Sequence, residues 1–128
     1  MSENNATTQT VLQVRFKLQV PPHAFLAQGR EAATIIASAE GLIWKIWIVQ
    51  EENFEMGGIY LFANRAAAEA YLSHPVIRAM SDNAAVISTQ TQLWDVERFL
   101  SALTRAPLPD ICAPATGTPF NQMLEALA

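Results

Sequence analysis

The residues with the most chemical potential lie in one stretch, residues 42–64, which reads LIWKIWIVQEENFEMGGIYLFAN. Two runs rich in tryptophan, isoleucine and other strand-forming residues flank a short polar segment, a pattern typical of a β-hairpin. The first run carries Lys45 between two tryptophans, and the second carries Tyr60 after a pair of glycines. Aromatic side chains on neighbouring strands, with a cation and a phenol among them, make this hairpin the first candidate for a ligand site.

A turn at Glu52 and Asn53 would fix the pairing of this hairpin, with Trp47 opposite Gly58 and Lys45 opposite Tyr60. Because side chains alternate along a strand, each face then collects its own set of residues. The sets are Ile43, Lys45, Trp47, Tyr60 and Phe62 on one face, and Trp44, Ile46, Ile48, Ile59 and Leu61 on the other. We expect the face with Trp44 to pack against helices. A bulge at the glycine pair would shift the register and change this division.

Gly58 is the feature that points to a cavity. A glycine opposite Trp47 removes a cross-strand side chain and frees space beside the indole, which makes a candidate ligand slot. In the alternative interpretation, the glycine pair bends the strand and the aromatic side chains fill the core of a dimer. The sequence leaves both interpretations open.

Few other groups are placed for chemistry. His74 can lie at the mouth of a pocket, although a lone loop histidine is more often structural or solvated, and His23 has the same status. Cys112 is the single cysteine and has no histidine near it in the sequence, which indicates an unreactive thiol. No grouping of His, Cys, Asp and Glu has metal-binding spacing, and no glycine-rich phosphate loop is present, so we expect no metal and no cofactor.

Composition narrows the class of protein. The 128 residues carry a formal net charge of -4 and are 51% hydrophobic, which suits one domain with a substantial core and argues against binding to nucleic acid or to an anionic membrane surface. No apolar run approaches the ~20 residues that cross a bilayer, and the start of the chain lacks the features of a secretory signal. We therefore expect a cytoplasmic protein.

The remaining sequence predicts alternating strands and helices. Apolar and polar residues alternate over residues 11–20, which indicates a strand that ends at Pro21-Pro22. Three- and four-residue spacing over residues 23–39 indicates a helix. Asn64 can cap a second helix over residues 65–72, which His74-Pro75 interrupts, and residues 85–96 form the last predicted strand.

This order predicts an α+β fold, a ferredoxin-like βαββαβ sandwich with an antiparallel four-stranded sheet. Right-handed crossovers place the helices on one face of that sheet. The other face would expose a large apolar patch, so we expect a homodimer in which two sheets stack about 10 Å apart and form an α+β barrel.

The domain is expected to span residues 11–104, with a short helix near its end. Residues 1–10 are polar and predict a flexible N-terminal arm. Residues 105–128 hold four of the seven prolines and predict a proline-rich extension, which ends in a short helix over residues 120–127.

Three segments together point to a family. GLIWKIW at residues 41–47, EMGGIYLF at residues 55–62 and AYL at residues 70–72 closely resemble the YdhR-like family of small proteins, assigned as mono-oxygenases largely by fold similarity. The resemblance covers roughly residues 11–100 and implies the dimeric α+β barrel superfamily. It also implies oxidation of a small aromatic compound with molecular oxygen.

The resemblance suggests roles for residues of the hairpin. In the cofactor-independent mono-oxygenases of this superfamily, a phenol is deprotonated and reacts with oxygen in an apolar pocket. On that pattern, Trp44 and Trp47 stack on the substrate ring, Tyr60 bonds its oxygen and Lys45 stabilises an anion. Glu55 is a candidate base, although a solvated carboxylate is the simpler reading. Phe62, Ile43 and His74 complete the expected substrate contacts.

Two other functional classes compete with the mono-oxygenase. A ferredoxin-like sheet that carries Tyr60, Phe62 and Lys45 can imitate an RNA-binding platform, but the acidic net charge argues against it. The stronger alternative is a non-catalytic dimer that binds a small apolar aromatic ligand or serves as a stress-related protein, because a pocket that binds a phenol and one that oxidises it need similar walls.

Overall fold

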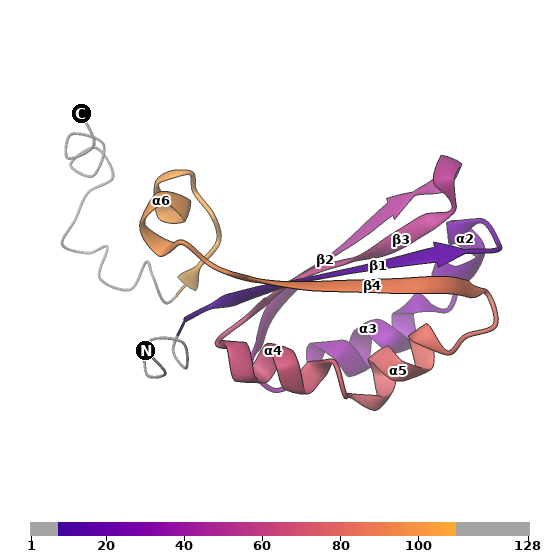
Figure 1. The fold of residues 1–128 in the computed structure, drawn as a ribbon, viewed down its shortest axis with the longest axis horizontal. Coiled ribbons are helices and arrows are strands. Elements are labelled where there is room, and N and C mark those ends of the chain that lie inside the picture. Colours follow the sequence, from indigo (N-terminus) through magenta and orange to yellow (C-terminus); the bar gives the residue numbers. More distant parts are fainter. Residues whose placement is uncertain (1–7, 110–128) are drawn as a thin grey trace. The chain divides into compact units, whose positions relative to one another are not determined.

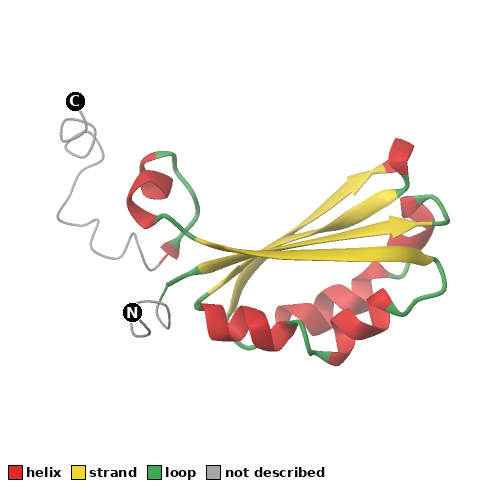
Figure 2. Ribbon diagram, in the orientation of Figure 1, coloured by secondary structure: helices red, strands yellow, loops and turns green. Residues whose placement is uncertain are grey.

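The computed structural model of the protein is built around a four-stranded antiparallel sheet (Figure 1, Figure 2). The structure describes residues 8–109. The sheet order β2-β3-β1-β4 is that of a ferredoxin-like domain, so the predicted α+β class is confirmed. The strands are β1 (Thr10–Leu18), β2 (Leu42–Gln50), β3 (Glu55–Phe62) and β4 (Val86–Asp95).

Four helices connect the strands, and they gather on one face of the sheet (Figure 1). They are α2 (Pro22–Leu26), α3 (Gly29–Ala37), α4 (Arg65–Tyr71) and α5 (Pro75–Ser81).

The helix boundaries agree with the sequence analysis in part. The single helix predicted over residues 23–39 is instead two helices, separated at Ala27 and Gln28. Asn64 caps α4 as predicted, since its side-chain oxygen accepts a hydrogen bond from the Ala67 N–H at 2.8 Å. Pro75 begins α5, where its missing N–H costs no helical hydrogen bond.

The core lies between the sheet and these helices. Alternate residues of β1 are buried on the helix side, and they are the apolar set that the sequence predicted: Leu12, Val14, Phe16 and Leu18. A register shift between Lys17 and Leu18 brings Val86 opposite Leu18, so Val86 packs against the core.

The hairpin keeps its predicted register over most of its length, with Lys45 opposite Tyr60 and Trp47 opposite Gly58. Its loop has four residues rather than two. Glu51–Asn53 form a 3-10 turn, and Phe54 adopts the left-handed conformation with a φ of 56°. The register survives because the extra residues add one position to each side of the turn. Near the open end, a shift between Leu42 and Trp44 places Leu42, rather than the predicted Ile43, opposite Phe62.

The predicted assignment of the hairpin faces is wrong. Tyr60 pairs with Leu12 of β1, and Gly58 pairs with Val14, so the face with Lys45, Trp47 and Tyr60 lies under the helices. Trp44 and Ile46 lie on the face that the helices leave uncovered. Both faces of the hairpin are apolar, so the sequence pattern alone did not decide between them, and the pairing of β3 with β1 does.

The chain divides into two compact units, Met1–Asp95 and Val96–Ala128. The sheet and the four helices belong to the first. Within its described residues, the second contains the short helix that the sequence predicted, α6 (Arg98–Leu103), which the Glu97 side chain caps by accepting from the Leu100 N–H at 2.7 Å. Residues 1–7 and 110–128 lie outside the described residues, as do the helix predicted over 120–127 and Cys112. The predicted boundaries of the arm and the extension stay predictions.

Gly57 allows the close approach of β3 to β1, because a Cβ added there would collide with the Val14 carbonyl oxygen. We expect Gly57→Ala to lower the free energy of unfolding by about 2 kcal/mol, since the strands would have to shift. The matched control is Gly29→Ala at the start of α3, where a Cβ meets open space and stability should stay unchanged or rise by up to about 1 kcal/mol. Urea unfolding of both variants checks this, and equal losses would contradict it.

Candidate functional site

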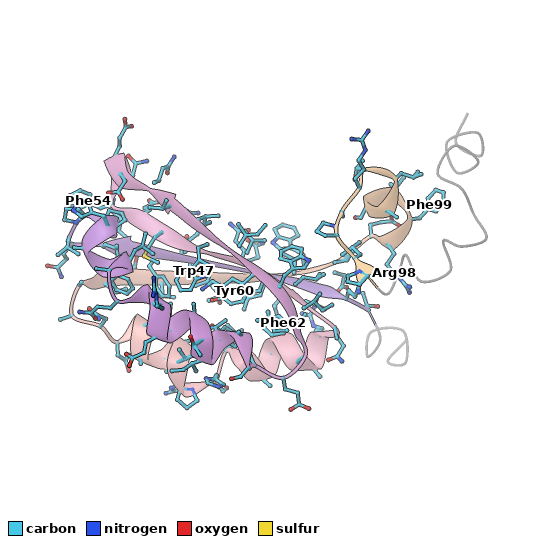
Figure 3. The ribbon with its side chains drawn as sticks, turned by 180° about the vertical axis from the view of Figure 1, so that it is seen from behind. Trp47, Phe54, Tyr60, Phe62, Arg98 and Phe99 are labelled. Carbon is cyan, nitrogen blue, oxygen red and sulfur yellow. The ribbon has the colours of Figure 1, made fainter. Side chains whose placement is uncertain are left out.

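Lys45 projects onto the helix-covered face of the sheet and lies on aromatic rings. Its Nζ is 3.3 Å from the centroid of the Trp47 ring and 4.7 Å from that of the Tyr60 ring, both within cation–π range. Among residues 8–109, no carboxylate lies within ion-pair distance of this amine. Figure 3 shows Trp47, Tyr60 and Phe62 following one another along the hairpin on the side of the helices (Figure 3). The amine is therefore held by aromatic faces and has no counter-ion in the described part of the chain.

Burial changes the acidity of this amine. It lowers the pKa of Lys45 from 10.5 to about 7, because the apolar surroundings disfavour the charged form. Near neutral pH, Lys45 is therefore divided between a free amine, which can accept a proton, and an ammonium, which can stabilise an anion.

Gly58 makes room for this arrangement. A Cβ at Gly58 would collide with Cε of Lys45 and lie 3.1 Å from Cε1 of Tyr60. The lysine stem thus occupies the space that the glycine leaves beside Trp47. The space that the first interpretation expected exists, but a side chain of the same hairpin fills it.

Two tyrosine hydroxyl groups form a buried pair next to the lysine. Tyr60 Oη and Tyr71 Oη are 3.0 Å apart, and the two rings are 4.9 Å apart. Burial raises the pKa of both phenols, and the neighbouring Tyr71 raises that of Tyr60 further. Both phenols therefore stay protonated at neutral pH. One hydroxyl donates to the other within this buried pair, and the bond links α4 to the sheet.

Two cavities border Trp47. The larger has a volume of about 410 Å³ and lies among α2, α3 and α5, with Phe25, Leu26 and Met80 in its wall. The smaller has a volume of about 210 Å³ and lies between α3 and the start of β2. Lys45 lines the smaller cavity together with Ala33, Ile36, Ala37, Leu42, Ile43, Trp44 and Trp47.

The structure brings together only part of the predicted site. Lys45, Trp47 and Tyr60 are in contact, and the Phe62 ring lies 5.9 Å from that of Tyr60. Ile43 sits at the register shift of β2 and borders the smaller cavity.

Three other predicted residues lie apart from this cluster or serve a structural purpose. Trp44 lies on the opposite face of the sheet, where it pairs with Leu61, although it borders the smaller cavity. Glu55 lies on that opposite face too, and its Oε1 is 3.4 Å from Nη2 of Arg15. His74 caps α5, since its Nδ1 accepts from the Val76 N–H at 3.0 Å, and its ring stacks on Tyr71 at 6.0 Å.

Tyr71 is a member of the cluster that the sequence analysis named only within the AYL motif of a predicted helix. Its hydrogen bond to Tyr60 depends on where α4 crosses the sheet. The lysine position carried a stronger signal, because a cation between two tryptophans in a strand is unusual on a buried face.

No group of three or more His, Cys, Asp or Glu side chains is placed to hold a metal ion within residues 8–109. Likewise, in this part of the chain no helix has the length and apolar character needed to cross a membrane.

Solved structures share the fold. A protein of unknown function from Nitrosomonas europaea matches with a TM-score of 0.59 and 20% identity, covering 72% of this chain and 92% of that one. SnoaB, a cofactor-independent oxygenase from Streptomyces nogalater, matches with a TM-score of 0.58 and 14% identity, covering 70% and 94%. A dabb family protein with a ferredoxin-like fold from Mesorhizobium loti matches with a TM-score of 0.52 and 19% identity, covering 68% and 95%. At these identities the likeness shows the fold alone.

The strand order and the one-sided helix layer define a ferredoxin-like α+β protein of the kind found in these structures. The chain belongs to the family described as putative mono-oxygenase ydhR, whose model matches residues 11–107. The resemblance that the hairpin motifs suggested is thereby confirmed. No curated protein sequence matches the chain.

The lowered pKa of Lys45 predicts a pH dependence of stability. Between about pH 7 and the ordinary lysine pKa of 10.5, the unfolded chain keeps a proton that the folded protein has released, so the free energy of unfolding rises with pH. The rise is at most about 1.4 kcal/mol per pH unit. Below about pH 7 both states hold the proton, and the dependence disappears.

Urea unfolding at about pH 6, 8 and 9.5 measures this effect. Wild-type protein should gain stability over this range relative to Lys45→Met. Lys17→Met is the matched control, because Lys17 is exposed on the same sheet, and it should keep the wild-type rise. Parallel curves for wild type and Lys45→Met would show that the buried amine titrates normally.

Proposed function

We propose that the protein oxidises a small phenolic aromatic compound with molecular oxygen and without a cofactor, at the smaller cavity beside Lys45 and Trp47. The observation that carries the proposal is an amine with a pKa of about 7 at a cavity wall, seated on an indole and without a counter-ion among the described residues. Membership of the mono-oxygenase family supports the reaction class.

Lys45 would act first as a base and then as a cation. Its neutral amine accepts the phenolic proton and becomes an ammonium, which pairs with the phenolate that it has just produced. A base with a pKa near the working pH is the most effective one, and a cation in apolar surroundings stabilises an anion more strongly than in water. Trp47 supplies an aromatic wall for the substrate ring.

The deprotonated substrate then supplies all the electrons. It passes one electron to oxygen, and the resulting superoxide and substrate radical combine into a peroxide anion. This anion takes a proton back from the Lys45 ammonium and becomes a hydroperoxide. Loss of water from the hydroperoxide leaves a carbonyl group. For an anthrone, a ring CH₂ becomes C=O, one oxygen atom enters the product, the other leaves as water, and the four electrons that reduce oxygen come from the substrate.

Oxygen uptake by the purified protein over naphthols, anthrones and hydroquinones, without added flavin or metal, tests this proposal. We expect Lys45→Met to lower kcat/KM at least about 100-fold, because it removes both the base and the cation, and Lys17→Met to leave it unchanged. Binding without oxygen uptake for every compound would favour the alternative function, a non-catalytic module for small aromatic ligands.

A pair of alanines distinguishes the two cavities. Ala37 borders the smaller cavity from α3, and Ala79 borders the larger from α5; both are exposed helical residues. Leucine suits a helix nearly as well as alanine, so neither substitution should unfold the protein. Ala37→Leu should weaken the binding of 1-naphthol at least about tenfold, while Ala79→Leu should not. Weaker binding in Ala79→Leu, with unchanged binding in Ala37→Leu, would show that the substrate binds in the larger cavity.

We also propose that the protein forms a homodimer through the sheet face that α2–α5 leave uncovered. Ile46 and Trp94 on this face are 53% and 50% exposed, and Ile48 and Ile59 lie beside Ile46. Apolar area of this kind is usually covered by a partner, and stacked sheets fit it. The polar residues of β1 and β4, including Gln13 and Gln92, share the same face.

Sedimentation velocity checks the dimer. Ile46→Asp should convert it to a monomer at micromolar concentration, because a charge would be buried between the two sheets. The control is Ile35→Asp on α3, an equally large apolar residue that is 46% exposed on the helix side, and it should stay dimeric. A wild-type protein that sediments as a monomer would refute the interface.

A further inference from the structure

We propose that Lys45 also forms a reversible imine with small aromatic aldehydes that enter the smaller cavity. This activity goes beyond the proposed oxidation and requires no oxygen. An amine that reacts with a carbonyl must be neutral, reachable and placed where the carbonyl compound dwells. The described residues supply evidence on each of these three requirements.

Burial among apolar side chains favours the neutral form of the Lys45 amine, whereas the Trp47 ring beneath its Nζ attracts the ammonium form. The lysine stem crosses Gly58, and α3 presents Ala33, Ile36 and Ala37 toward the same cavity. The titratable group that faces it is the Tyr60 phenol on β3, which is uncharged because burial raises its pKa. None of the described neighbours supplies a negative charge that would hold the amine in its protonated form.

The cavity supplies access and selectivity. Lys45 is part of its wall, so a ligand in the 210 Å³ space lies against the lysine side chain. The other side chains of the wall are apolar and include Trp47, which suits an aromatic ring better than a charged or strongly hydrated aldehyde. An aromatic aldehyde with a single ring is therefore the matching class of ligand.

The reaction balances without an added oxidant or reductant. The Nζ lone pair attacks the carbonyl carbon and forms a C–N bond, while the carbonyl π electrons move to oxygen. A proton passes from nitrogen to that oxygen and gives a carbinolamine. Loss of the hydroxyl group with the second nitrogen proton, as water, leaves the C=N bond of the imine, and addition of water reverses the step.

The sequence provides an internal control, since Lys17 and Lys45 are its two lysines. Lys17 projects from β1 on the uncovered side of the sheet and is exposed, with its Nζ donating to the Asn53 carbonyl oxygen. Both amines meet the same reagent in one sample, and digestion separates them into different peptides. The ratio of modification at Lys45 to modification at Lys17 therefore does not depend on protein concentration or on reagent quality.

The experiment is reductive trapping of benzaldehyde by cyanoborohydride on the full-length chain at about pH 7, followed by peptide mass spectrometry. We expect benzylation of Lys45 to exceed that of Lys17 at least about tenfold, because each pKa unit below the ordinary value raises the neutral fraction about tenfold. The α-amino group is resolved in its own peptide. Equal modification of the two lysines, or an unmodified Lys45, would overturn the proposal.

Three variants test whether the cavity, and not only the reactivity of the amine, selects the aldehyde. Ala37→Leu, which narrows the smaller cavity, should lower Lys45 benzylation at least about fivefold, and Ala79→Leu should not change it. Gly58→Ala, which displaces the lysine stem, should bring Lys45 down to the level of Lys17. If Ala37→Leu has no effect, the cavity does not select the aldehyde and the proposal fails. Because oxygen uptake is not measured here, this outcome is independent of the proposed oxidation.

Discussion

The Lys45 amine rests on the Trp47 indole because Gly58 leaves room for its stem, and this contact depends on the pairing of β2 with β3. A register slip of one residue would turn the lysine to the uncovered face, away from the Trp47 ring and from the helix layer. The same pairing sets Tyr60 beside Lys45. The candidate site is therefore a consequence of strand register, and the helix layer above it supplies the apolar surroundings.

Burial of this cation without a counter-ion costs stability, so the rest of the structure has to offset that cost. The buried core on β1 and the Tyr60–Tyr71 pair lie next to the site and fix the sheet and α4 around it. Residues that lower stability in exchange for a perturbed pKa are more often found at functional sites than elsewhere. Lys45 fits this description better than any other lysine or arginine in the described part of the chain, because the others are exposed or, like Arg65, paired with carboxylates.

The two faces of the sheet have different tasks. The helix side holds Lys45, Trp47 and the tyrosine pair, together with the cavities that border Trp47. The uncovered side holds exposed Ile46 and Trp94, which fit the proposed dimer. Side chains alternate along β2, so neighbouring residues of this strand lie on opposite faces of the sheet. A substitution at Ile46 should thus affect assembly with little direct effect on the amine next to it in the chain.

Local sequence patterns were enough to predict most of the elements, their order, the hairpin register over most of its length, and the family. These follow from local patterns: alternation in β1, the Asn64 cap, the prolines at helix starts, and the motif around Trp47. The tertiary structure decided which hairpin face lies under the helices, because both faces are apolar and the choice depends on how β3 pairs with β1. It also decided which candidates meet. Lys45 and Tyr60 do, while Glu55 lies on the other face, because contact across strands and helices depends on packing that no local pattern encodes.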